Sequence, residues 1–370
     1  MEHTVVRRMI AALAVGALAV GLSACGRQTE ANAGTGGNGP AAKGTIGVAM
    51  PTKTSERWIK DGDYIKQQLE AAGYKVNLQY ANDDIPTQVT QVNDMVTKGN
   101  QVLVVASIDG TALKGALKEA KDAGIPVIAY DRLLRDTDAV DYYTTFDNLK
   151  VGKLQAESLL KGLEASGAPK PWNVELFAGS PDDNNATFFF NGAMQVLQPK
   201  IDSGEIKIAS GETNFKTVAT LRWDAAVAKK RMENVLTKAY SKADVNGVLS
   251  PYDGLSRGII AALKGSGYGS GGKKLPVVTG QDAELESVKS ILAGEQYSTV
   301  FKNTRDLAQA TVKMIQEIAD KKTVTVNDTE SYDNGVKKVP TQLLEPVAAD
   351  KENVKQVLLD AKYYTEDQLK

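Results

Sequence analysis

Short apolar runs alternate with amphipathic segments from residue 44 almost to the C-terminus. Apolar runs of this length are typical of strands buried on both faces, and the amphipathic segments repeat with the period of a helix. Glycine at helix ends and proline before strands mark the boundaries. The predicted strands are 45–50, 75–81, 101–107, 126–130, 141–146, 171–179, 206–210, 246–250 and 275–280, and the predicted helices are 56–72, 85–98, 110–123, 148–165, 184–198, 219–240 and 254–264. This alternation predicts βαβ units with mostly parallel sheets, an α/β fold class.

The N-terminal segment has a different pattern and is interpreted as a lipoprotein signal peptide over residues 1–25. Two arginines precede an apolar stretch at 9–22, which is shorter than the roughly 20 residues of a typical transmembrane helix. The sequence LSAC at 22–25 has the pattern of a bacterial lipobox, in which Cys25 is lipidated and becomes the new N-terminus. The alternative is an ordinary secretory signal with a chance cysteine, but Cys25 is the only cysteine of the chain, which favours lipidation.

Residues 26–43 are rich in Gly, Ala, Asn and Thr and predict a flexible tether between the lipid and the folded part. No other apolar run approaches twenty residues. We therefore expect an extracytoplasmic protein attached by lipid to the outer face of the bacterial cell membrane.

The composition excludes several classes of site. The only histidine is His3, inside the predicted signal peptide, so the mature chain lacks the residues for Ser-His-Asp or Cys-His catalysis and for the usual zinc sites. We expect no metal, no cofactor and no catalytic residue, although carboxylate chemistry of the glycosidase kind stays open. The net charge of −1 shows no excess of basic residues of the kind that binds nucleic acid.

Carboxylates follow six of the predicted strands, at the positions where open α/β sheets bind ligands. Any single one is as easily explained as an N-cap of the next helix, but the recurrence of aspartate favours a shared polar cleft. These residues are Asp109, Asp131, Asp147, Asp182 with Asp183, Asp253 and Asp282.

A cleft of this composition matches the hydroxyl groups of a sugar, each of which donates and accepts hydrogen bonds. Asp131 and the adjacent Arg132 present an acceptor and a donor side by side. Trp58 and Trp223 are candidate platforms for the flat face of a sugar, with core packing as the alternative, and Trp172 is assigned to the core. Neighbouring Arg and Asn side chains would keep the carboxylates ionised, which suits a binder better than a general acid.

Nine segments together carry a family resemblance that extends from about residue 44 to the C-terminus. They are MPTKTSERWIKDG, DDIPTQVTQVNDMVTKG, VLVVASIDG, VIAYDRL, TFDNLKVG, GSPDDNNA, SPYDGLS, GQDAE and NGVKKVP. The chain closely resembles the periplasmic xylose-binding and ChvE-type multiple-monosaccharide binding proteins, which are the solute-binding components of ABC sugar importers. The ChvE-type group is the closer match.

The resemblance implies the type I periplasmic binding protein fold, in which two αβα lobes joined by three crossovers close on a sugar. The crossovers are expected near 144–148, 298–303 and 334–340. One lobe would comprise 44–146 and 302–338, and the other 147–301 and 339–370.

The resemblance also implies which residues contact the sugar. Tyr252 replaces an amide of the xylose binders, whereas the Asp253 beside it is retained, and this difference leaves hexoses and uronates open beside pentoses. Asp109 ends a strand at the same edge and is a further candidate. With Trp58 from the composition argument, the candidate sugar-binding set is Arg57, Trp58, Asp109, Asp131, Arg132, Asp183, Asn185, Trp223, Asp253, Asp282 and Lys302.

The predicted function is capture of a monosaccharide by closure of the lobes and delivery to the transmembrane subunits of an ABC importer, by a monomeric protein without enzymatic activity. An alternative is a sensor that presents its sugar-loaded form to a receptor kinase. A glycosidase is the second alternative. DNA binding is set aside because nothing before residue 44 could form a helix-turn-helix.

Overall fold

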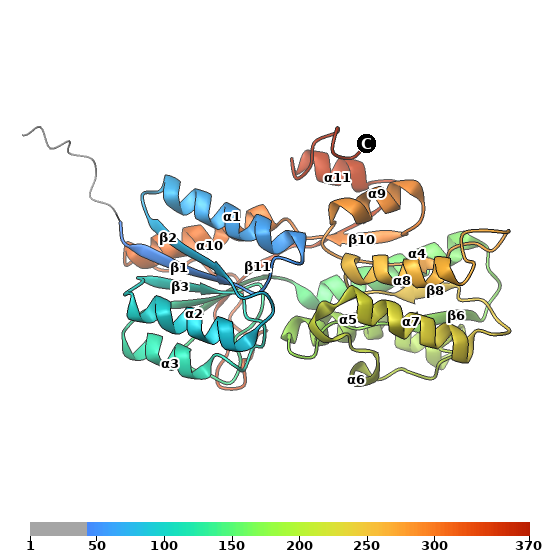
Figure 1. The fold of residues 1–370 in the computed structure, drawn as a ribbon, viewed down its shortest axis with the longest axis horizontal. Coiled ribbons are helices and arrows are strands. Elements are labelled where there is room, and N and C mark those ends of the chain that lie inside the picture. The colour runs from blue at the N-terminus through green and yellow to red at the C-terminus, as the bar shows by residue number, and fades with distance from the viewer. Residues whose placement is uncertain (1–42) are drawn as a thin grey trace, which may run out of the picture. The chain divides into compact units, whose positions relative to one another are not determined.

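The computed structural model describes residues 43–370, so the predicted signal peptide, Cys25 and all but the last residue of the predicted tether lie outside the described part. Two parallel sheets organise the chain into two lobes (Figure 1), which confirms the predicted α/β class. Among the described residues, no helix has the length and hydropathy needed to cross a membrane.

The first lobe is built on a six-stranded parallel sheet with the order β11-β5-β4-β3-β1-β2. Its core strands β1, β3 and β4 are almost entirely buried, as their continuous apolar sequences require. Helices α1 and α10 cover one face and α2 and α3 the other. The elements are β1 (Thr45–Met50), α1 (Glu56–Ala71), β2 (Lys75–Tyr80), α2 (Ile85–Thr97), β3 (Val102–Val105), α3 (Lys114–Asp122), β4 (Val127–Tyr130), β5 (Tyr142–Phe146), α10 (Thr304–Ala319) and β11 (Thr341–Leu344).

The second lobe has a four-stranded parallel sheet with the order β7-β6-β8-β9, and an antiparallel pair of β10 and β12. Helices α4 and α5 cover one face of the sheet and α7 and α8 the other. The elements are α4 (Asn148–Ser166), β6 (Trp172–Leu176), α5 (Asn184–Asp202), β7 (Ile206–Lys207), α6 (Phe215–Val218), a 3₁₀ turn (Leu221–Trp223), α7 (Ala225–Ala239), β8 (Gly247–Leu249), α8 (Asp253–Gly265), β9 (Val277–Val278), α9 (Leu285–Ala293), β10 (Ser298–Phe301), β12 (Val347–Asp350) and α11 (Val354–Asp360).

In each sheet the second strand in sequence lies on one side of the first strand and the third lies on its other side. The direction in which strands are added therefore switches between β1 and β3 in one lobe and between β6 and β8 in the other. Ligands of such sheets bind outside the carboxyl ends of the strands at this switch point. The loops after the strands of both lobes therefore supply the residues of the site described below.

The chain passes between the lobes three times, after β5, after β10 and after β11. Figure 1 shows the consequence, since α10 lies beside α1 although most of the chain separates them. One predicted boundary is wrong: residues from 339 onward were assigned to the second lobe, but Thr341–Leu344 pair with β5. The third crossover therefore lies between Leu344 and Val347, because a sixth parallel strand completes the first sheet before the chain leaves it.

The predicted helix at 219–240 is also wrong in its first turn. The helix α7 begins only at Ala225, because Arg222 and Trp223 have left-handed backbone conformations with φ of 57° and 56°. Residues other than glycine rarely adopt this backbone conformation, and two such residues in succession interrupt a right-handed helix. The interruption turns Trp223 toward the cavity between the lobes.

Candidate binding site between the lobes

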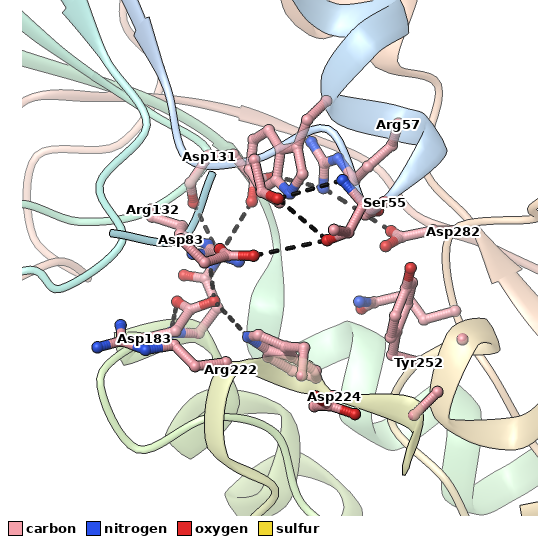
Figure 2. A pocket seen from close by; sticks show the side chains of 18 of the residues that line it. Ser55, Arg57, Asp83, Asp131, Arg132, Asp183, Arg222, Asp224, Tyr252 and Asp282 are labelled. Carbon is pink, nitrogen blue, oxygen red and sulfur yellow. Dashed lines mark hydrogen bonds and ion pairs between the residues drawn. The ribbon is translucent and has the colours of Figure 1, made fainter. Parts of the chain in front are cut away.

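A cavity of about 460 Å³ opens between the two lobes and is lined by loops that follow strands of both sheets (Figure 2). Nine of the eleven predicted sugar-binding residues line it, and the two exceptions are Asp109 and Asp253. The nine are Arg57, Trp58, Asp131, Arg132, Asp183, Asn185, Trp223, Asp282 and Lys302. Residues that lie far apart in the sequence, from Arg57 to Lys302, thus line one cavity.

Arg57, in the first turn of α1, is the centre of a buried charge network. Its guanidinium lies 2.8 Å from Asp61 Oδ2, 3.0 Å from Asp131 Oδ2 and 3.8 Å from Asp282 Oδ1. Asp282 belongs to the second lobe, so Arg57 joins the lobes. Lys302, at the second crossover, lies 3.0 Å from Asp282 and 3.9 Å from Asp131. Such charges are retained in an interior only when each has a partner of opposite sign, as these do.

Asp131 and Arg132 are adjacent in the sequence, but their side chains do not pair with each other. Asp131 pairs with Arg57, whereas Arg132 Nε lies 3.0 Å from Asp183 Oδ2 in the other lobe. The two adjacent side chains therefore serve two different ion pairs, and the second of these crosses the cavity.

The backbone of Asp131 is strained, and hydrogen bonds from its neighbours hold it in one orientation. Its φ is 59°, in the left-handed region. Three donors converge on its carbonyl oxygen: Tyr143 Oη at 2.5 Å, Thr145 Oγ1 at 2.9 Å and Asn185 Nδ2 at 2.8 Å. A sparsely populated conformation persists only when its surroundings over-determine it, and such residues cluster at ligand sites. Asp282, with a φ of 89°, shares the feature.

The two predicted tryptophan platforms differ in how they are held. The guanidinium groups of Arg57 and Arg132 lie 4.3 and 5.0 Å from the ring centre of Trp58, which is almost fully buried. Trp223 donates from Nε1 to Asp183 Oδ2 at 3.2 Å, so the platform and one charged acceptor are positioned together. Trp172 lies in the core of the second lobe, as predicted.

Asp109 and Asp253 have other roles in the structure. Asp109 accepts from the backbone and side chain of Thr111 in a local turn. Asp253 is fully buried behind the cavity, where it accepts from the backbone N–H of Glu284 at 2.9 Å and from Thr299 Oγ1 at 3.1 Å. A third strand-end carboxylate, Asp147, caps α4. For Asp109 and Asp147 the contacts are local, whereas Asp253 is held by residues that are distant in the sequence.

The sequence analysis missed residues that support or line the cavity. Asp61 lies one helical turn after Arg57, and because charges at i and i+4 on a helix are neighbours, this spacing is the signal that could have identified it. Phe189, Arg222 and Gln281 line the cavity from the second lobe. Gln281 follows the predicted strand at 275–280, next to Asp282, and shares its signal, whereas the direction of Phe189 and Arg222 depends on how α5 and the 3₁₀ turn are placed.

The electrostatic environment shifts the pKa values of the buried carboxyl groups in different directions. Burial by itself raises the pKa of Asp131, but the positive charges of Arg57, Lys302 and Arg132 outweigh it and the pKa is lowered. For Asp183, burial dominates over the opposing Arg132 and the pKa is raised. Burial also raises the pKa of Asp61 from 3.8 to about 6, with Arg57 acting in the opposite direction. Asp131 is therefore an ionised acceptor at neutral pH.

The raised pKa of Asp61 gives a testable pH dependence. The folded chain binds this proton more tightly than the unfolded chain, so ionisation of Asp61 reduces stability as the pH rises from about 4 through 6. A shift from 3.8 to about 6 corresponds to about 3 kcal/mol. We expect the unfolding free energy of Asp61→Asn, relative to wild type, to rise by about this amount between pH 4 and pH 7 in urea titrations.

Asp84→Asn is the matched control for this measurement. Asp84 is an exposed N-cap whose pKa is lowered by its hydrogen bonds to Thr87, so its contribution to stability is present at neutral pH and lost as the pH falls. The two variants should therefore differ from wild type with opposite slopes. Parallel profiles for Asp61→Asn and wild type would contradict the role assigned to Asp61.

Five polar atoms of the cavity wall make no hydrogen bond within the described part of the chain, although four of them, all but Gln281 Oε1, form ion pairs. They are Asp131 Oδ2, Arg132 Nε, Arg222 Nη1, Gln281 Oε1 and Asp282 Oδ1. Buried polar atoms are nearly always hydrogen-bonded in folded proteins, so the Gln281 oxygen is free to accept from a ligand. The wall thus offers donors and acceptors interleaved with two indole rings.

A family profile described as a periplasmic binding protein domain matches residues 46–323. The multiple sugar-binding periplasmic receptor ChvE of Rhizobium radiobacter is 60% identical over 330 residues, which cover 89% of this chain and 93% of that protein. The D-xylose-binding periplasmic protein of Escherichia coli is 37% identical over 324 residues, covering 88% and 92%.

A solved structure gives the same result for the fold. The solute-binding protein of an ABC transporter from Clostridium phytofermentans, with bound β-D-glucose, superimposes with a TM-score of 0.84 at 46% identity. The match covers 88% of this chain and 100% of that one.

Proposed function

This chain belongs to the periplasmic binding protein family and is of the ChvE type, and we propose that it is the extracytoplasmic solute-binding component of an ABC sugar importer. Its ligand is a monosaccharide of the aldopentose, aldohexose or uronate class. The lobes close on the sugar and the loaded protein delivers it to the transmembrane subunits. The attachment of the protein to the cell membrane through lipidated Cys25, and its monomeric state, are part of this proposal and rest on the sequence.

The observation that carries the proposal is the combination of interleaved charges and indole rings in one cavity. Carboxylate acceptors such as Asp131 and Asp282 lie within 4 Å of cationic donors. Each hydroxyl of a sugar donates and accepts, so it matches paired groups of this kind, and charge-assisted hydrogen bonds are the stronger class. Trp58 and Trp223 add apolar surface for the C–H faces of the sugar.

The mechanism follows from the distribution of these residues over two lobes. Arg57, Asp131 and Arg132 come from the first lobe, and Asp183, Trp223 and Asp282 from the second. A sugar contacts both sets only when the lobes are closed, so binding shifts the open–closed equilibrium toward the closed form. A permease that recognises the closed form then receives loaded protein in preference to empty protein.

We propose binding without catalysis. A glycosidase needs one protonated carboxyl group as a general acid. Asp183 has a raised pKa, but its Oδ2 is contacted by the Nε atom of Arg132 and the indole N–H of Trp223, and its Oδ1 accepts from the backbone N–H of Asn185, so neither oxygen is free to donate to a glycosidic oxygen. Incubation with aryl glycosides should release no phenol.

Isothermal titration calorimetry with a panel of pentoses, hexoses and uronates tests the proposal. We expect saturable binding of at least one aldose with one site per chain. A solution of the polyol glycerol at the same concentration controls for nonspecific heats. The absence of heat with every sugar of the panel would refute the proposed function.

A further inference from the structure

Tyr252 lines the cavity with a side chain whose single hydrogen-bond donor is already used. It precedes α8 at the end of the loop after β8 and is 8% exposed. Its hydroxyl donates to Glu284 Oε1 at 2.6 Å. Burial, followed by the charge of Glu284, raises the pKa of Tyr252, so the hydroxyl keeps its proton.

Glu284 is itself fully engaged. Its Oε1 also accepts from Ser55 Oγ of the first lobe at 3.2 Å, and its Oε2 accepts from Arg257 Nη2 at 2.6 Å. The backbone N–H of Glu284 is bound by Asp253. Because these contacts fix the acceptor, the Tyr252 hydroxyl cannot turn to a ligand without breaking a short bond to a buried carboxylate. The same carboxylate links the lobes through Ser55.

The ring of Tyr252 forms an apolar wall. It meets Trp223 edge to face, with ring centres 6.1 Å apart and planes at 86°. A Cβ on Gly254 would lie 2.4 Å from Tyr252 Cε1, so the glycine allows the ring to lie against the backbone. Figure 2 shows Tyr252 on one side of the cavity, with Asp131, Arg132 and Asp183 on the other. Asp282 lies on the same side as Tyr252 in Figure 2 and is charged, so the Tyr252 ring forms an apolar patch within a polar wall.

We propose that Tyr252 determines the breadth of sugars that the site accepts, an inference that rests on the proposed function. A wall that hydrogen-bonds a hydroxyl rejects a sugar lacking it by about 10⁴-fold or more, whereas an apolar wall discriminates by only about 10- to 100-fold. At the sugar carbon that faces Tyr252, the site selects by size and apolar contact. Aldoses that differ only at this carbon, by epimerisation or by loss of a hydroxyl or hydroxymethyl group, bind with comparable affinity.

The test measures ratios of affinity across a fixed panel: D-glucose, D-galactose, D-xylose and D-fucose (6-deoxy-D-galactose). Tyr252→Phe keeps the ring and removes the hydroxyl, so it should weaken all sugars by a common factor, through loss of the Glu284 contact, and preserve their ratios within about threefold. Tyr252→Asn replaces the apolar wall with a donor and an acceptor. It should change the ratio between the best and the poorest ligand by at least about tenfold.

Tyr240→Phe is the matched control. Tyr240 donates to Glu175 Oε1 at the same distance of 2.6 Å, inside the same lobe but away from the cavity. Its loss should lower the melting temperature and leave all affinities unchanged. If Tyr252→Asn melts too low for titration, Tyr252→Gln supplies the same amide on a longer side chain.

Two results would overturn the inference. Unchanged ratios in the amide variants would show that the sugar does not reach Tyr252, and a changed order in Tyr252→Phe would show that the hydroxyl itself reads the sugar. Failure of the proposed function is distinguished from both, since the wild-type chain would then bind no sugar of the panel.

Discussion

Asp131→Ala is expected to weaken sugar binding by about 2–5 kcal/mol, the range for removal of one half of a buried, hydrogen-bonded charge pair. The substitution removes an acceptor from the cavity wall and leaves the cations of Arg57 and Lys302, which are 4% and 2% exposed, with fewer partners. Arg57 retains Asp61 and Asp282, so the chain should still fold. Titration calorimetry and thermal melting are measured on the same preparations.

Asp147→Ala is the matched control for Asp131→Ala. Asp147 also follows a strand of the first sheet, but its carboxylate accepts from the backbone N–H of Lys150 and caps α4. Its loss should cost about 1 kcal/mol of stability and leave sugar affinity unchanged. If Asp131→Ala behaves in the same way, with a lower melting temperature and full affinity, Asp131 is a structural ion-pair partner and the site assignment fails.

The class of fold and the location of the site could be predicted from sequence because both depend on regular features. Alternating buried strands and amphipathic helices specify parallel sheets, and parallel sheets bring their strand ends to one edge. Asp131, Asp183 and Asp282 are predicted in this way, because they lie in the loops that follow β4, β6 and β9. The family resemblance added residues such as Lys302, which lies at a crossover and follows no rule of periodicity.

The roles of individual side chains could not be predicted, because they depend on contacts between distant segments. Asp253 and Asp282 look alike in sequence, yet Asp253 is directed behind the cavity toward Thr299 and Gln296, and Asp282 into the cavity. Arg132 pairs with Asp183 across the cavity because the two lobes meet there. The left-handed backbone at Arg222 and Trp223 interrupts a segment whose composition predicts a helix.

The breadth of ligands and the strength of binding have different structural origins in this site. Strength depends on paired charges that need a hydroxyl at a defined position, as at Asp131. Breadth, in our proposal, depends on Tyr252, whose hydroxyl is already used by Glu284. Loss of the Tyr252 hydroxyl should therefore lower all affinities by a common factor and preserve their ratios, and the two variant series can be compared on one sugar panel.

Gly179→Ala is expected to weaken sugar binding by about 3 kcal/mol, a factor of about 100, although the new methyl group does not itself need to contact the sugar. A Cβ at position 179 would lie 1.9 Å from Trp223 Cη2 and 2.3 Å from Cζ2. The indole is rigid and must move as a unit. Its displacement breaks the hydrogen bond from Trp223 Nε1 to Asp183 and removes the ring from the cavity wall, and hydrogen bonds to charged groups are worth about 1.5–3 kcal/mol.

Gly265→Ala separates this effect from the general consequence of replacing glycine. Gly265 ends α8 in the same lobe, and a Cβ there meets no atom within 4 Å. That variant should keep full affinity and gain about 0.4–1 kcal/mol of stability, because alanine restricts the unfolded chain. In Gly179→Ala, tryptophan fluorescence should shift together with the loss of affinity. If the fluorescence shifts and the affinity stays within about threefold of wild type, Trp223 moves without consequence for the sugar, and the platform must be assigned to Trp58 alone.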